Sequence, residues 1–206
     1  MSTQINDPQI QACTTKRTDI NRLAEVMARG FADDPVMNWA LGSPKPQKLM
    51  FSLLARHIYL PRGGGVLLHE NQEDKAACLW LHPDQSKDFA MLPTLHLTAS
   101  VVRHSGPSAI RRTLDLDARL EHKHPSIPHV YLFAIAVDPR FQGRGLGKRV
   151  MAPMLRYCDE HGLPAYLENS KAQNLPFYRG RGFEVVEDFD VDGQGLPMWL
   201  MLRPPA

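Results

Sequence analysis

The sequence predicts a single α/β domain, residues 1–206, built around one sheet. Its length of 206 residues is that of one domain. Its composition, 43% hydrophobic and 22% charged, is that of a globular protein rather than of a disordered chain. Apolar runs of strand length alternate along the chain with segments of helical periodicity, and this alternation is typical of the α/β class.

The first expected elements are a strand and a helix. The strand is predicted near Ile10–Lys16. Thr18 is a candidate N-cap, and apolar residues then recur at helical spacing as far as Phe31. The helix should end before Asp33-Asp34-Pro35.

A second helix and a hairpin are expected next. Helical spacing runs from Leu49 to Pro61, and the three glycines at 63–65 are expected to break the chain. Two short strand-like runs follow, Val66–His69 and Ala76–Leu81, and the polar segment 70–75 between them predicts a hairpin with a long loop. Residues 86–104 and 107–121 have helical patterns, the first with a kink or an uncertain course at Pro93.

The remaining elements begin with the clearest strand, Val130–Val137, whose nearly continuous apolar run is typical of a strand covered on both faces. A glycine-rich loop and a helix to about His161 follow, and Pro153 should bend that helix. The last expected elements are strand Ala165–Glu168, a short helix at 173–179, and strands Phe183–Phe189 and Pro197–Leu202.

Charge and composition disfavour several classes of protein. The formal net charge is only +2, so the positive footprint of a dedicated nucleic-acid binder is missing. The N-terminus is polar and no apolar run reaches the ~18–20 residues of a membrane span, so we expect no membrane partner and a cytoplasmic protein. We also expect no disulfide framework among the three scattered cysteines, and no metal site among the histidines of segment 121–129, which resembles a proline-broken connector.

A glycine-rich segment directly follows the run Val130–Val137. It reads Asp138-Pro139-Arg140-Phe141-Gln142-Gly143-Arg144-Gly145-Leu146-Gly147-Lys148 and leads into a helical pattern. A strand, a glycine loop and a helix N-terminus together make an anion site, because free backbone N–H groups and the positive end of the helix dipole converge there. Two phosphate motifs do not fit: a Walker A loop needs glycine at 142 and Ser or Thr at 149, and a dinucleotide fingerprint needs glycine at 148.

The segment does match Gln-x-x-Gly-x-Gly, and it resembles the acetyl-coenzyme A loop of the GCN5-related N-acetyltransferase (GNAT) family. Downstream, a strand, a short helix with Asn174 and Tyr178, and the pair Gly182-Phe183 are similar to the second signature of that family. The order and spacing of both segments match, and the resemblance covers about residues 130–203. Residues 40–125 match only loosely, and this is the part in which such enzymes shape the acceptor pocket.

The resemblance implies the GNAT fold: a mixed, mostly antiparallel central sheet that is split between two central strands and flanked by helices. It also implies direct transfer of an acetyl group from acetyl-coenzyme A (acetyl-CoA) to a primary amine. We expect a small-molecule acceptor such as an aminonucleoside antibiotic. The alternatives are a protein or peptide amine as acceptor, or a non-catalytic acetyl-CoA sensor. Dimers are common in the family, so a homodimer is one option.

The resemblance assigns a set of residues to the coenzyme. The end of the first central strand should splay from its neighbour at a bulge and offer main-chain groups to the pantetheine arm and the acetyl oxygen. The loop amides should hold the pyrophosphate, two basic side chains can add charge there, and Asn174 should touch the arm unless it only caps its helix. The expected coenzyme-binding residues are Ile135, Ala136, Val137, Gln142, Gly143, Arg144, Gly145, Leu146, Gly147, Lys148, Asn174 and Tyr178.

Two side chains are candidates for catalysis. Tyr178 is the expected general acid, because a phenol with a pKa near ~10 can protonate a departing thiolate whose pKa is ~8.5. Many family members carry a glutamate on the strand before the loop, but here that strand has no carboxylate. Glu168, at the end of the next strand, is the nearest substitute as general base, or else a structural carboxylate. Other candidates for acceptor binding or proton relay are Asp34, His104 and Asp33.

Overall fold

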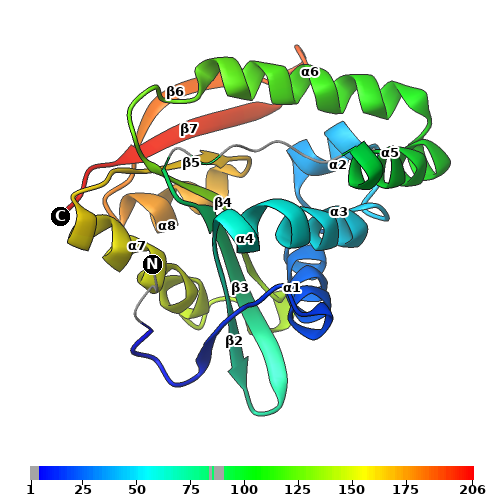
Figure 1. The fold of residues 1–206 in the computed structure, drawn as a ribbon. Coiled ribbons are helices and arrows are strands. Elements are labelled where there is room, and N and C mark those ends of the chain that lie inside the picture. The colour runs from blue at the N-terminus through cyan, green and yellow to red at the C-terminus, as the bar shows by residue number, and fades with distance from the viewer. Residues whose placement is uncertain (1–4, 84, 86–90) are drawn as a thin grey trace.

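The computed structural model describes residues 5–83, 85 and 91–206 (Figure 1). The described elements follow in chain order: β1 (Ile10–Ala12), α1 (Arg17–Gly30), α2 (Pro35–Leu41), α3 (Gln47–Leu54), a π-helical turn (Ala55–Tyr59), α4 (Leu60–Arg62), β2 (Gly63–Glu70), β3 (Glu73–Leu81), α5 (Met91–Ser105), α6 (Pro107–Lys123), β4 (Val130–Val137), a 3-10 turn (Pro139–Phe141), α7 (Leu146–His161), β5 (Ala165–Asn169), a 3-10 turn (Ala172–Asn174), α8 (Leu175–Arg179), β6 (Glu184–Asp190) and β7 (Pro197–Arg203).

The strands form one sheet in the order β1-β2-β3-β4-β5-β7-β6. All neighbouring pairs are antiparallel except β4 and β5, which are parallel. The prediction of a mixed, mostly antiparallel sheet flanked by helices is therefore confirmed.

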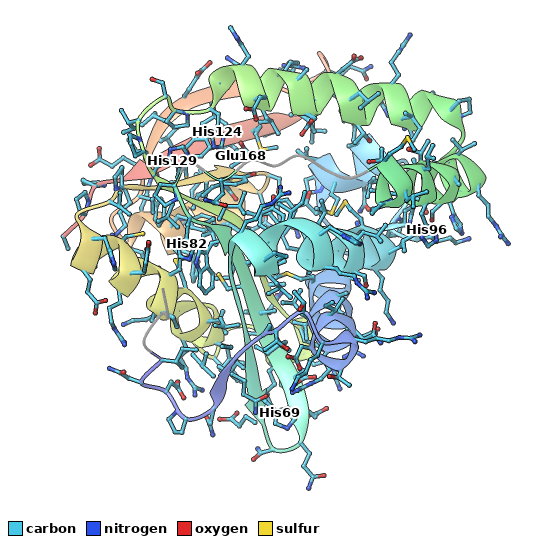
Figure 2. All side chains as sticks on the ribbon, in the orientation of Figure 1. His69, His82, His96, His124, His129 and Glu168 are labelled. Atoms are coloured by element: carbon cyan, nitrogen blue, oxygen red, sulfur yellow. The ribbon has the colours of Figure 1, made fainter. Side chains whose placement is uncertain are left out.

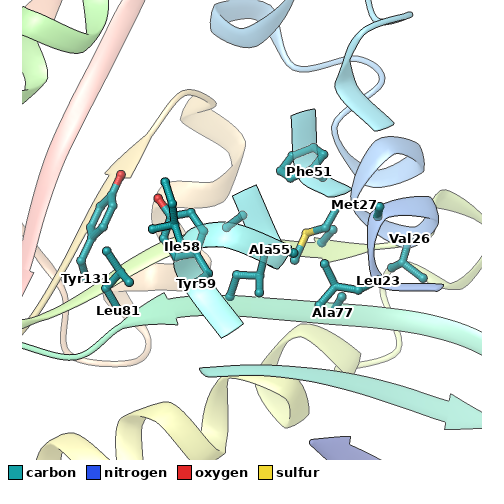
Figure 3. Close-up of a cluster of buried hydrophobic side chains, with 14 of the residues drawn as sticks. Leu23, Val26, Met27, Phe51, Ala55, Ile58, Tyr59, Ala77, Leu81 and Tyr131 are labelled. Atoms are coloured by element: carbon teal, nitrogen blue, oxygen red, sulfur yellow. The ribbon is translucent and has the colours of Figure 1, made fainter. Parts of the chain in front are cut away.

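The central strands are buried on both faces. Leu79 of β3 packs in one cluster with Leu23 of α1 and Phe51 of α3, part of which Figure 3 shows. The next residue, Trp80, belongs to a second cluster that includes Met154 of α7. Successive side chains of a strand point to opposite faces, so the two clusters lie on opposite sides of the sheet. This double burial explains the continuous apolar run of β4.

The hairpin of β2 and β3 differs from the prediction in two ways. The glycines at 63–65 do not break the chain but begin β2, because side chains of neighbouring elements occupy the space above them: a Cβ added at Gly64 would lie 2.2 Å from Cζ2 of Trp80. The connection is also tight rather than long. Asn71 and Gln72 alone make the turn, with φ angles of 53° and 63°, which suit a two-residue hairpin turn.

The N-terminal elements also need correction. The first strand ends at Ala12, and α1 begins at Arg17 rather than after a Thr18 cap, because Asp19 reaches back to the backbone N–H and hydroxyl of Thr14 at 2.9 and 2.7 Å. The predicted end of α1 before Asp33 is confirmed. Helix α2 was not predicted, although Asp34 caps it and Pro35 opens it, which is a usual start signal.

The other helices follow the predicted order. Helical structure runs through Pro61 to Arg62, interrupted by the π-helical turn. Residues 86–90 of the first helix predicted in segment 86–121 lie outside the described residues, and Pro93 falls in the first turn of α5, where proline is tolerated. In the last quarter of the chain the predicted elements agree with the structure to within two residues, and Pro153 lies buried inside α7.

Two sequence expectations concern absences. Across residues 5–83, 85 and 91–206, no helix combines the length and apolar character needed to cross a membrane. Within the same residues, no group of three or more His, Cys, Asp or Glu side chains is arranged to hold a metal ion.

Candidate active site

The two central strands, β4 and β5, pair only over their first residues. Val130–Leu132 pair with Ala165–Leu167, and beyond them the strands part, although β4 continues to Val137 and β5 to Asn169. The pairing of β4 with β3 skips Phe133, so the predicted bulge lies there, just before segment 135–137. The sheet is therefore split between two central strands, as predicted.

Asp138 holds the start of the glycine loop. Its Oδ1 accepts a hydrogen bond from the backbone N–H of Arg140 at 3.0 Å. Its Oδ2 accepts from the guanidinium groups of Arg140 at 3.0 Å and of Arg29, on α1, at 3.1 Å. These hydrogen bonds, above all those from Arg140, lower the pKa of Asp138 to about 2. The carboxylate thus fixes the loop to α1.

Two glycines give the loop its shape. Gly143 and Gly145 have φ angles of 75° and 74°, in the left-handed region that favours glycine. A Cβ added at either would have no atom within 4 Å, so the backbone faces open space. Helix α7 begins directly after Gly145. The loop and the helix N-terminus together have the form of an anion site.

A groove of about 400 Å³ runs from this loop to the point where the strands part. All the predicted coenzyme-binding residues line it except Arg144 and Lys148, which are exposed outside it. The guanidinium of Arg144 lies 5.6 Å from the centre of the Phe141 ring. The residues that line the groove are Gly30, Asp33, Ile135, Ala136, Val137, Phe141, Gln142, Gly143, Gly145, Leu146, Gly147, Lys171, Gln173, Asn174, Phe177, Tyr178 and Arg181.

A smaller pocket of about 70 Å³ adjoins the groove between β4 and β5. Glu168, Asn169 and Ser170 line it from β5 and its end, and Asp34 lines it from the start of α2. The pocket and the groove share five lining residues, which are Gly30, Ile135, Lys171, Asn174 and Tyr178. The two spaces therefore lie side by side along this common wall.

Tyr178 stands in that common wall. The residue is 7% exposed, and its ring packs edge-on against Phe177 and Phe183, with ring centres 5.1 and 6.0 Å away. Burial is the main reason that the pKa of Tyr178 is raised well above its usual range, with the nearby Cys78 and Asp34 acting in the same direction. The phenol is therefore protonated at neutral pH, as a general acid must be.

Glu168 lies at the other end of the small pocket, with its side chain 9% exposed. Its Oε2 accepts a hydrogen bond from the hydroxyl of Tyr131 at 2.8 Å. Its Oε1 is buried and accepts no hydrogen bond from any described residue. The carboxylate thus has one oxygen that accepts a hydrogen bond and one that accepts none from the described residues.

The remaining candidates have clear positions. His104 lies on α5, outside both spaces, with Nδ1 2.8 Å from the carbonyl of Ser100. Asp34 lines the small pocket, but its Oδ1 caps α2 at 2.8 Å and its Oδ2 accepts from the Ser170 hydroxyl. Both side-chain oxygens of Asp34 therefore already accept hydrogen bonds. Asp33 lines the groove and pairs with Lys171.

Comparison with known proteins agrees with this geometry. The model of the Acetyltransferase (GNAT) family matches residues 114–183, the segment from α6 through β4, the loop and β5 to α8. An uncharacterised N-acetyltransferase of Schizosaccharomyces pombe is 26% identical over 208 residues, which cover 91% of this chain and 80% of the relative.

Two solved structures are similar over nearly the whole chain. The histone acetyltransferase HPA2 and related acetyltransferase from Corynebacterium glutamicum has a TM-score of 0.70 at 20% identity, with 97% of each chain covered. The arylalkylamine N-acetyltransferase 2 of Aedes aegypti has a TM-score of 0.64 at 14% identity, with 96% of this chain and 99% of that chain covered. The chain has the GNAT fold. This fold, the family match and the relative named N-acetyltransferase together support one assignment. The protein is an acyltransferase of the GNAT type, and its acetyl donor is acetyl-CoA.

The residues of the GNAT groove fit acetyl-CoA. Beyond Leu132, the β4 backbone has no strand partner on its β5 side among the described residues, so its main-chain groups are available to an extended arm. The space before Gly143 and Gly145 and the N-terminus of α7 suit a pyrophosphate.

Sequence reasoning missed several side chains of this groove. Arg181 lies over the ring of Phe177, 3.7 Å from its centre, and burial lowers the pKa of its guanidinium. Arg181 lies beyond the end of α8, after Gly180, so helical spacing from Tyr178 does not indicate it. The approach of Gly30 to β4, where an added Cβ would lie 2.7 Å from Cβ of Ala136, has no local sequence signal.

Proposed function

We propose that this protein transfers the acetyl group of acetyl-CoA to the primary amine of a small molecule, and that it does so in the cytoplasm. The observation that carries the proposal is the placement of a carboxylate, Glu168, and a protonated phenol, Tyr178, in the wall of one small pocket that adjoins the coenzyme groove. Amine acetylation needs one group of each kind.

The residues divide the reaction between them. The loop Gly143–Gly147 and the N-terminus of α7 bind the phosphates, and main-chain groups of segment 135–137 hold the arm and the acetyl oxygen. Glu168 takes a proton from the bound ammonium, and the free amine then attacks the thioester carbonyl carbon. As the carbon–sulfur bond breaks, Tyr178 donates its proton to the departing sulfur, and the second proton that the nitrogen loses on becoming an amide restores the phenol. Asn174 borders both spaces and contacts the arm.

The preference for a small-molecule acceptor rests on the similarity of three short sequence motifs. Leu167-Glu168-x-Ser170, Asn174-x-Pro176-Phe177-Tyr178 and the ending Trp199-Leu200-Met201 are similar to puromycin N-acetyltransferase. An aminonucleoside of that kind is therefore the first acceptor to test.

The experiment is free-thiol release from acetyl-CoA by the purified protein, with a panel of amines: puromycin, an aminoglycoside, a polyamine and a lysine-bearing peptide. We expect release with a small amine and none without an amine. Release with the peptide alone would replace the small-molecule proposal with a protein acceptor. Binding of acetyl-CoA without release from any amine would instead favour a sensor. Size-exclusion chromatography of the same sample tests the homodimer.

A further inference from the structure

A third cavity of about 200 Å³ lies close to Glu168 and is separate from the coenzyme groove. It is bordered by His82 after β3, by Tyr131 of β4, and by the connector from His124 to His129 that joins α6 to β4. Residues 126–128 of this connector are exposed. The cavity therefore offers a route from the neighbourhood of Glu168 to solvent.

His124 links this cavity to the carboxylate. Its Nδ1 lies 3.7 Å from Oε1 of Glu168, the oxygen that accepts no hydrogen bond from a described residue. Figure 2 shows His124, His129 and Glu168 close together below α6. The His124 ring is held edge-on between the rings of Tyr131 and Tyr166, whose centres are 5.0 and 4.8 Å away. A shift of about 0.5 Å would bring Nδ1 within hydrogen-bonding distance of Oε1.

When His129 is neutral, its contacts fix the tautomer of His124. Nδ1 of His129 lies 2.7 Å from the carbonyl of Ile127, and a carbonyl only accepts, so this Nδ1 carries the hydrogen. Nε2 of neutral His129 is then an acceptor, and it lies 2.9 Å from Nε2 of His124, which must donate. In neutral His124 this leaves the lone pair on Nδ1, the nitrogen that faces Glu168.

We propose that His124 relays the proton that Glu168 takes from the amine, and that His129 is the residue that positions it. This inference rests on the proposed acetyl transfer. The O–H bond of protonated Glu168 breaks and a bond from the proton to Nδ1 of His124 forms, which restores the carboxylate. The resulting imidazolium, whose side chain is 16% exposed and borders the cavity, releases its Nδ1 proton to water there, which restores the lone pair on Nδ1. The Glu168 side chain is only 9% exposed, and bound coenzyme and amine would fill the groove and the small pocket beside it, so a relay gives its proton another way out.

One test needs no acceptor amine. Nitrogen NMR of the ¹⁵N-histidine-labelled protein, assigned with His124→Gln and His129→Gln, reports which ring nitrogen carries hydrogen. For neutral His124 we expect hydrogen on Nε2 and a bare Nδ1 whose signal changes in Glu168→Gln. Hydrogen on Nδ1 of neutral His124 would overturn the relay, whether or not any amine is acetylated.

The second test uses turnover with the panel amine that gives thiol release. His124→Ala should lower kcat about 10-fold or more, the size expected when one proton-transfer step is lost, with little change in the Kd for acetyl-CoA. Imidazole should restore activity, more so for more basic imidazoles, because the cavity can admit the ring. His82→Ala is the matched control. His82 borders the same cavity but packs on Tyr157, and its variant should keep full kcat.

The outcomes separate a relay from a structural role. Equal rescue by pyrrole, which has an N–H but no basic nitrogen, would mean that the ring only fills space and would overturn the proposal. Unchanged kcat in His124→Ala, or loss that imidazole does not restore, would overturn it too. His124→Gln, which keeps most of the volume, should lose kcat like His124→Ala while its melting temperature stays near that of the wild type.

Discussion

At the scale of single residues, burial fixes the protonation state of the proposed acid. Tyr178 is 7% exposed and sits where the groove meets the small pocket. Burial of the phenol raises its pKa, so it carries its proton at the pH at which a thiolate would otherwise leave unprotonated.

Removing this hydroxyl tests the role directly. Tyr178→Phe should lower kcat about 10-fold or more and leave the Kd for acetyl-CoA nearly unchanged, because the ring keeps its packing while the proton donor is lost. Steady-state kinetics and calorimetry measure the two quantities. Tyr157→Phe, a buried tyrosine on α7 outside the groove, should retain full activity. Equal kcat for Tyr178→Phe and the wild type would remove Tyr178 from the chemistry.

The sequence predicts some of these residues and not others. Tyr178 and Glu168 lie in segments whose sequence motifs resemble those of a known family, so the resemblance predicts both as site residues. His124 and His129 come from a connector that, read alone, is only a proline-broken link. Their meeting with Glu168 depends on how α6 crosses to β4, a long-range contact that leaves no periodic signal.

At the scale of elements, the glycine loop combines two requirements that can be separated. Gly145 needs a left-handed backbone, and its surface must stay open toward the groove. Gly162, directly after α7, has a similar left-handed backbone (φ 62°, ψ 30°) and equally open space, but it does not line the groove.

This pair of glycines gives a matched experiment. Gly145→Ala should lower the free energy of unfolding by about 1–2 kcal/mol, the cost of left-handed backbone for an L-residue, and should also weaken acetyl-CoA binding. Gly162→Ala should cost a similar amount of stability and leave binding unchanged. Urea denaturation and calorimetry measure the two effects. Equal affinities in both variants would show that the loop does not hold the coenzyme.

Elements are predictable where local pattern and tertiary environment agree. The apolar run of β4 gives its bounds correctly because both faces are covered. The glycines at 63–65 mislead because their role depends largely on Leu79 and Trp80 of β3, which are distant in sequence. Glycine occurs both in turns and where neighbouring chains pack closely, so a run of glycines in the sequence does not distinguish the two.

At the scale of the whole molecule, Asp138 ties α1 to the loop and makes stability depend on acid. Its pKa falls from the usual value to about 2 in the folded protein, so the stabilisation is present above pH ~4 and is lost as the pH falls toward 2. This corresponds to about 2 kcal/mol. In urea denaturation from pH 6 to pH 2.5, Asp138→Asn should be the less stable protein at pH 6, and the difference should shrink with acid. A constant difference would contradict this assignment.

The topology was predictable only through the resemblance. The parallel pairing of β4 with β5, and its end at Leu132, are long-range facts that hydrophobic spacing does not contain. Segment 40–125, which resembles the family only loosely, supplies neighbours whose roles came from the structure alone, such as His82 and His124 at the third cavity.

The wall shared by the groove and the small pocket has a kinetic consequence. A donor seated against Ile135, Asn174 and Tyr178 becomes part of the surface that an acceptor meets, so the acceptor site is complete only after the donor has bound. Initial-rate plots should therefore intersect rather than run parallel. Free coenzyme A should compete with acetyl-CoA but not with the amine. Parallel lines would instead point to an acetylated enzyme, which would discharge the donor before the amine arrives.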